Sequence, residues 1–120
     1  MSKLVLVSTD LMLGARIEGA ARQCGFTIVT TAGQGPALEA SAGDCRAVFI
    51  DLRMPGINTA ELVETLREQG DSSLTIVACG PHVHEQRLDE ARRAGCDLVL
   101  TRGQLDRDAE SIFQQFADDP

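Results

Sequence analysis

Short apolar runs alternate along the chain with longer segments in which apolar residues recur every three or four positions. The short runs predict buried strands, and the longer segments predict helices that pack through one face. The runs that we assign to strands are 4–7, 26–30, 47–50, 74–78 and 98–100. Because a helical pattern follows each run, the sequence predicts five strand–helix units.

The helical segments are bounded by residues that commonly begin or end helices. We expect helices over 13–24, around 37–40, from 58 or 59 to 70, over 88–94 and over 105–116. Asn58 or Thr59 can cap the third helix at its start. Gly25, Gly70 and Gly95 follow three of the segments, and glycine readily adopts the left-handed conformation that ends a helix.

Five strand–helix units with short, right-handed connections form an open parallel sheet covered by helices on both faces. Such α/β proteins bind ligands at the carboxyl ends of the strands, near the point where the strand order reverses. The segments that follow four of the strands begin at Ser8, Asp51, Cys79 and Thr101. We therefore expect a functional site among these segments.

The composition limits the class of protein and its partners. A chain of 120 residues with 43% hydrophobic content is enough for one packed core, so we expect residues 1–120 to form a single domain. The net charge of −7 disfavours nucleic acid and anionic membrane surfaces as direct partners. The sequence contains no CxxC pair, signal-peptide pattern or apolar run of membrane length, which is typical of a cytoplasmic protein with reduced thiols.

Two segments carry a resemblance to a known family. AVFIDLRMPG, in which Asp51 closes a buried strand, resembles the acceptor segment of bacterial response-regulator receiver domains, and AGCDLVLTRG resembles their segment around the fifth strand. The resemblance implies a flavodoxin-like (βα)5 fold with strand order 2-1-3-4-5. It also implies a non-enzymatic domain of a two-component phosphorelay. Asp51 would accept a phosphoryl group from a histidine kinase or phosphotransfer protein, and the domain would signal to an output protein.

The resemblance assigns further site residues. Mg²⁺ would be held by the carboxylates of Asp10 and Asp51 and by the backbone carbonyl of Arg53. Thr9 stands where receivers carry a second acid, so this metal site is less anionic than usual. Arg102 falls at the position of the phosphate-contacting lysine, and its planar guanidinium differs in shape from a compact ammonium.

The Ser or Thr hydroxyl with which receivers contact the phosphoryl group is missing. Counting back from Gly95 without gaps places this position at Gly80, and a shift of one residue places it at Cys79. Val99 stands where receivers usually have a switching aromatic residue. These losses leave open an alternative function, that of a pseudo-receiver acting as a phosphorylation-independent protein-interaction module.

Asp10 and Arg102, the two charged residues that the resemblance assigns to the site of Asp51, each allow a second interpretation. Asp10 could simply cap the first helix, because aspartate accepts hydrogen bonds from free helix amides. Arg102 could pair with Asp51 or with a neighbouring acid. We predict that Asp10 and Asp51 converge on one Mg²⁺, and that Arg102 lies near Asp51 and partly occupies the space of a phosphoryl group.

Other ligand motifs are incomplete. Cys79, His82 and His84 form a C-x2-H-x-H pattern of ligand types that bind zinc, but spacing shows no fourth ligand. Histidines that face solvent at a helix start are the favoured interpretation. A dinucleotide fingerprint is broken at Leu38 and is therefore absent. A small enzyme or flavin carrier is the weakest of the function classes, because STDLMLGAR after the first strand is too apolar for a phosphate-binding loop.

Overall fold

The computed structural model describes residues 3–69 and 73–117, in which strands and helices alternate strictly. The strands are β1 (Lys3–Val7), β2 (Thr27–Thr31), β3 (Cys45–Asp51), β4 (Thr75–Gly80) and β5 (Leu98–Thr101). The helices are α1 (Leu11–Gln23), α2 (Gln34–Ser41), α3 (Thr59–Gln69), α4 (Glu85–Ala94) and α5 (Arg102–Ala117). Among the described residues, no helix is both long enough and apolar enough to cross a membrane.

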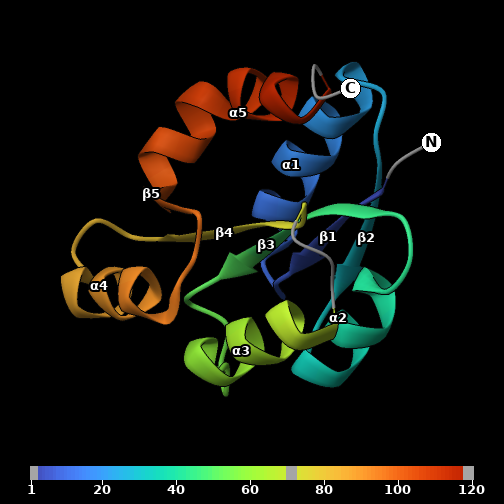
Figure 1. Ribbon diagram of the computed structural model, residues 1–120. Coiled ribbons are helices and arrows are strands. Elements are labelled where there is room, and N and C mark those ends of the chain that lie inside the picture. The colour runs from blue at the N-terminus through green and yellow to red at the C-terminus, as the bar shows by residue number, and fades with distance from the viewer. Residues whose placement is uncertain (1–2, 70–72, 118–120) are drawn as a thin grey trace.

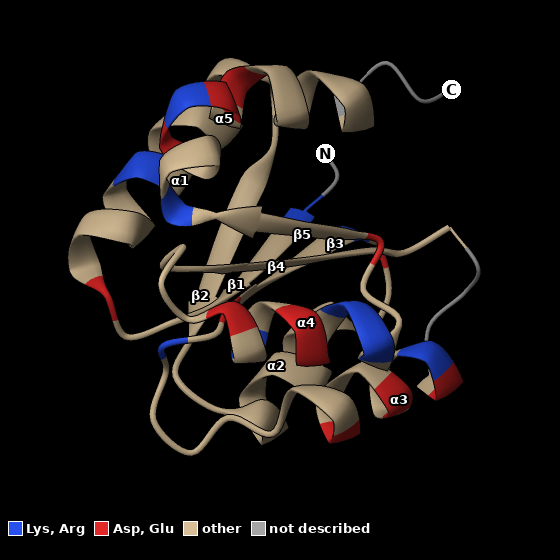
Figure 2. Cartoon of the chain, turned by 90° about the vertical axis from the view of Figure 1, so that its left-hand side faces the viewer, with Lys and Arg blue, Asp and Glu red and all other residues tan. Residues whose placement is uncertain are grey.

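The five strands form one parallel sheet in the order β2-β1-β3-β4-β5. Helices α1 and α5 cover one face, and α2, α3 and α4 cover the other (Figures 1 and 2). The predicted α/β class and the order 2-1-3-4-5 are therefore confirmed. The strand order reverses between β1 and β3, so a ligand site is expected at the carboxyl ends of these two strands.

The predicted elements are all present, and their ends differ by a few residues. Strand β2 begins at Thr27 because the amide of Phe26 donates to the carbonyl of Ala21 at 3.0 Å, which makes Phe26 part of the turn that ends α1. Gly25 and Gly95 have φ angles of 82° and 100°, in the left-handed conformation expected of glycine after a helix. The predicted helix end at Gly70 lies outside the described residues.

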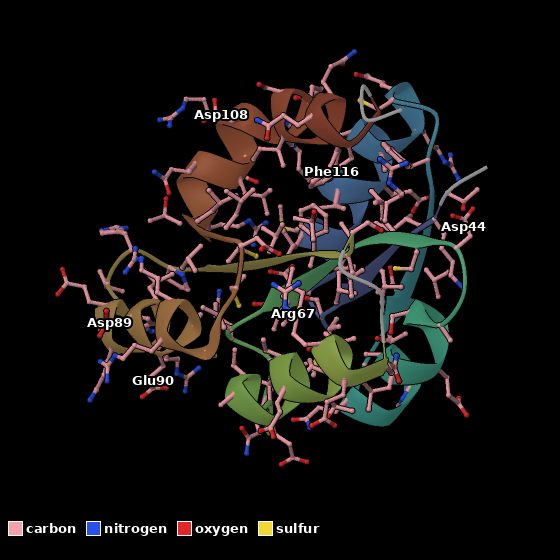
Figure 3. All side chains as sticks on the ribbon, in the orientation of Figure 1. Asp44, Arg67, Asp89, Glu90, Asp108 and Phe116 are labelled. Atoms are coloured by element: carbon pink, nitrogen blue, oxygen red, sulfur yellow. The ribbon has the colours of Figure 1, made fainter. Side chains whose placement is uncertain are left out.

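An aromatic cluster joins β3 to α5. The ring of Phe49 meets Phe113 edge to face with centroids 5.1 Å apart, and Phe116 lies 6.2 Å from Phe49. Phe116 points from α5 toward the sheet (Figure 3). The cluster packs α5 against β3. Because β3 ends at Asp51 and α5 begins at Arg102, this packing helps to place Arg102 relative to the end of β3.

Candidate functional site

Asp51 ends β3 and is almost completely buried, with 5% of its surface exposed. Its Oδ2 accepts a hydrogen bond from the hydroxyl of Ser8 at 2.6 Å, and its Oδ1 accepts one from the amide of Arg53 at 2.9 Å. Both carboxylate oxygens therefore have a donor. These two bonds hold the side chain in one orientation.

Ser8 is a site residue to which the sequence analysis assigned no role. It directly follows β1, the neighbour of β3, and is 3% exposed. Its hydroxyl donates to Asp51 and accepts a hydrogen bond from the amide of Asp10 at 3.0 Å. The position of Ser8 in the sequence could have indicated this bond to Asp51. A polar residue directly after a buried strand needs a hydrogen-bond partner at the same edge of the sheet.

Asp10 is the N-cap of α1. Its Oδ1 accepts hydrogen bonds from the amides of Met12 at 3.0 Å and Leu13 at 3.1 Å, so the helix-cap interpretation of this residue is confirmed. The amide of Leu13, followed by the bond to Arg102, lowers the pKa of the Asp10 carboxyl below its ordinary value. Asp10 is therefore held in its charged form.

Arg102 begins α5 and pairs with the same aspartate. Its Nη1 donates to Oδ2 of Asp10 at 3.0 Å, and its Nε donates to Oδ1 of Asp106 at 3.3 Å. The sequence allowed Arg102 to pair with Asp51 or with a neighbouring acid, and the structure shows the pairing with neighbouring acids. Arg102 also lines one small cavity together with Asp51.

That cavity has a volume of about 20 Å³ and lies directly beside Asp51. Its lining is completed by Leu13, Arg53, Cys79, Gly80 and Pro81. A cavity of this size holds about one water molecule. The space directly beside Asp51 within this lining is thus smaller than a phosphoryl group.

The sequence matches no protein-family model and no curated protein, but the structure matches solved structures over nearly its whole length. One is the receiver domain of a sensor histidine kinase from Pseudomonas aeruginosa, with a magnesium ion coordinated in its active-site cleft. It is 18% identical, with a TM-score of 0.78 and 97% of each chain covered. The chain has the receiver fold.

Two further receivers extend this comparison. A CheY-like receiver domain from Methylobacillus flagellatus is 24% identical, with a TM-score of 0.77 over 97% of this chain and 98% of that one. The chemotaxis response regulator CheY4 of Vibrio cholerae is 17% identical, with a TM-score of 0.77 over 97% and 98% of the two chains. The fold is thus shared at low sequence identity, and the site residues must be judged by their own geometry.

Two residues at the end of β4, Cys79 and Gly80, are the candidates for the hydroxyl position. Cys79 is paired with Asp51 in the register of β3 and β4, and paired residues point to the same face of a sheet. A side chain at Gly80 would instead point to the other face and meet the Cβ of Leu52 at 3.3 Å. Cys79 therefore faces the Asp51 side of the sheet, while both Cys79 and Gly80 line the cavity beside Asp51. Neither residue carries a hydroxyl, and Gly80 stays the predicted hydroxyl position.

Cys79 is a poor substitute for the missing hydroxyl. The side chain is 1% exposed, and burial, with a smaller contribution from the negative charge of Asp51, raises its pKa to about 12. The thiol is therefore neutral, and a neutral thiol is only a weak hydrogen-bond donor. The end of β4 therefore offers only a weak side-chain donor on the Asp51 side of the sheet.

The Mg²⁺ that the resemblance implies does not fit this arrangement. The two oxygens of Asp10 accept hydrogen bonds from the α1 amides and Arg102, and those of Asp51 from Ser8 and the Arg53 amide, so a cation would have to compete with these donors. The guanidinium beside Asp10 would also repel a divalent cation. In the described part of the chain, no three His, Cys, Asp or Glu side chains are grouped so as to hold a metal.

The C-x2-H-x-H pattern also forms no metal site among the described residues. Cys79 is buried in the sheet, whereas His82 is exposed and His84 is half-buried before α4. The three side chains therefore do not converge on one point. Nδ1 of His84 is buried and has no hydrogen-bond partner among the described residues.

Replacement of Asp10 by asparagine should reduce the dependence of stability on acid pH. Asparagine can still cap α1 but carries no charge. The folded protein lowers the pKa of Asp10, so its contribution to stability is complete above the unfolded pKa of about 3.9 and is lost as the pH falls through the folded pKa. In urea denaturation below about pH 4, the wild type should lose more free energy of unfolding than Asp10→Asn. Equal losses in the two proteins would contradict this role.

Proposed function

We propose that this chain is a pseudo-receiver, a signalling module of the receiver fold that acts by binding an output protein without being phosphorylated. The observation that carries the proposal is the ion pair between Arg102 and Asp10 at 3.0 Å, beside an Asp51 with both oxygens hydrogen-bonded. Arg102 thus neutralises Asp10, and two neutral donors satisfy the oxygens of Asp51. The charge of Asp10 is balanced without a bound cation.

The hydrogen-bond donors of the site support the same function. A phosphoryl group can bias a two-state domain only through contacts that differ between the states. A hydrogen bond to a charged acceptor contributes roughly 1.5–3 kcal/mol, and the buried thiol of Cys79 is a weak donor for it. Without that contact, we expect the domain to stay mostly in one state and to present a constant surface to its partner.

Exposed apolar residues beside the site support a protein as the partner. Leu11 and Met12, which begin α1 directly after Asp10, are 88% and 79% exposed, and Val83 in the loop before α4 is 69% exposed. Neighbouring large apolar side chains left exposed, as Leu11 and Met12 are, commonly mark protein contacts. None of the four cysteines is in a disulfide, which suits the reducing cytoplasm in which we expect this module to act.

The second candidate is the phosphoacceptor function, in which a histidine kinase or phosphotransfer protein modifies Asp51. The observation that favours it is the placement of Asp51 at the end of β3, on a cavity that it shares with Arg102. Movement of Arg102 away from Asp10 would enlarge this cavity and leave a cation near the phosphoryl group. Phosphorylation would then depend on breaking the Arg102–Asp10 pair.

Intact-mass measurement after incubation with acetyl phosphate and magnesium separates the two candidates. The pseudo-receiver function predicts no added phosphoryl mass on the wild type, while a receiver with the full set of site residues gains it under the same conditions. Asp51→Asn is the control for modification elsewhere. A phosphoryl adduct on the wild type that is absent from Asp51→Asn would establish the phosphoacceptor function instead.

A further inference from the structure

A larger cleft, of about 750 Å³, lies between the segment that follows β3 and helix α4. One wall is formed by residues 52–60 and the other by α4 residues between 87 and 94. Both walls belong to the side of the sheet that α3 and α4 cover, whereas Asp10 and α1 lie on the opposite side (Figure 1). Arg53 alone lines both this cleft and the small cavity beside Asp51.

Positive groups gather in this cleft although the chain as a whole is acidic. Arg53, Arg87 and Arg93 line it together with a single acid, Glu90. Glu90 is exposed on α4, where Figure 3 labels it, and Figure 2 shows both acidic and basic residues on this helix. With a net charge of −7, the protein does not attract anions in general, so an anion would be recognised here by local contacts.

Two of the arginines are available to a ligand. Nη1 of Arg87 donates to the carbonyl of Leu52 at 2.8 Å, which holds its guanidinium at the wall of the cleft. Within the described residues, the exposed side chain of Arg53 makes no hydrogen bond or ion pair. Arg93 is already paired with Asp89. Arg53 and Arg87 therefore leave unused donors that match the geometry of a carboxylate.

The remaining lining favours an apolar neighbour for that carboxylate. Met54, Ile57 and Ala94 lie in the same cleft, and all three also pack against the apolar cluster beneath it. Helix α3 begins in the cleft at Thr59, and the positive end of its dipole adds to the attraction for an anion. The matching ligand has an acidic group next to an apolar one.

We propose that this cleft binds an acidic segment of a protein partner, with a carboxylate on Arg53 and Arg87 and an adjacent apolar side chain against Met54 and Ile57. The proposal rests on the proposed function as a protein-interaction module. Most residues of the cleft wall are exposed, including Pro55. An open cleft suits a segment of a larger protein, because the rest of that protein can cover the exposed wall. Small-molecule sites instead bury most of their ligand.

Amide chemical shifts of the full chain, titrated with two capped peptides, test the proposal. One peptide alternates Asp and Leu, and the other alternates Asn and Leu. The acidic peptide should shift the amides of residues 52–60 and 87–94, and the neutral one should not. Arg53→Gln should weaken the binding about tenfold, because one hydrogen bond to a charged group is lost.

The control is Arg92→Gln. It removes the same charge from α4 at an exposed position outside the cleft, and binding should stay within about twofold of the wild type. Arg53 is the preferred test residue because Arg87 also bonds to the backbone and its loss could disturb the fold. Binding that is lost in Arg53→Gln and kept in Arg92→Gln supports the cleft as an acidic-segment site.

Two results would overturn the proposal. One is the absence of shifts in the cleft with the acidic peptide, or equal shifts with the neutral peptide. The other is equally tight binding of hexanoate at the same amides, which would indicate a site for a free carboxylic acid. A phosphoryl adduct on Asp51 of the wild type, together with peptide binding that is lost in Arg53→Gln and kept in Arg92→Gln, would remove the proposed function and leave the cleft in place.

Discussion

Replacement of Arg102 by alanine should strengthen the binding of Mg²⁺ at the strand ends by about tenfold or more. Arg102 bonds to Asp10 at 3.0 Å and places a positive charge where a metal would approach that carboxylate. Two unit charges about 4 Å apart interact by about 4 kcal/mol at an effective dielectric constant of about 20, and about 1.4 kcal/mol already corresponds to a tenfold change in affinity. Removal of the guanidinium both frees an oxygen of Asp10 and removes this repulsion.

Calorimetric titration with magnesium chloride measures the effect. The matched control is Arg107→Ala, which removes the same charge from an exposed position on α5, where Arg107 pairs with Asp108. The control should bind magnesium as the wild type does. Equal affinities in Arg102→Ala and the wild type would show that the Arg102–Asp10 pair is not what keeps the cation out.

Replacement of Phe113 by alanine should lower the free energy of unfolding by about 3–5 kcal/mol. Phe113 is fully buried on α5 and meets the ring of Phe49 edge to face at 5.1 Å. The substitution leaves a cavity between α5 and β3, the two elements whose ends carry Arg102 and Asp51. The substitution should therefore weaken the packing of α5 on β3, which holds Arg102 near the end of β3, and lower the stability of the whole fold.

Urea denaturation at neutral pH tests this value. Gln115→Ala, at an exposed position on the same helix, is the control and should change the free energy of unfolding by no more than about 0.5 kcal/mol. A loss below about 1 kcal/mol in Phe113→Ala would mean that α5 does not depend on the aromatic cluster for its position.

The arrangement of strands and helices could be predicted from the sequence because the central strands are buried on both faces. Ala47 to Ile50 form an unbroken apolar run, whereas the helices show apolar residues on one side only. Periodicity does not determine which strands are neighbours. The order 2-1-3-4-5 came from the resemblance carried by the segment around Asp51, and the structure has that order.

The position of Asp51 at the carboxyl end of β3 could also be predicted, since the apolar run stops at that residue. The acid with which Arg102 pairs could not be predicted from the sequence. Arg102 can reach more than one acid, and whether it bonds to Asp10 or Asp51 depends on the angle at which α5 leaves β5, which spacing does not contain.

The end of β4 allows two assignments for a different reason. The count back from Gly95 places the hydroxyl position at Gly80, whereas the residue paired with Asp51 is Cys79. Both residues line the cavity beside Asp51, and neither carries a hydroxyl. The loss of the hydroxyl could therefore be predicted from the sequence, but the face to which each residue of β4 points could not.

The most direct test of the closed site is a comparison of amide chemical shifts with and without beryllofluoride, a phosphoryl mimic, in excess magnesium. The contacts of Asp51, Asp10 and Arg102 predict that shifts are absent or confined to the loops around Asp10 and Asp51. Large shifts spread over residues 79–103 would contradict the account, because they would show that the site opens, binds the mimic and transmits the change to β4, α4 and β5.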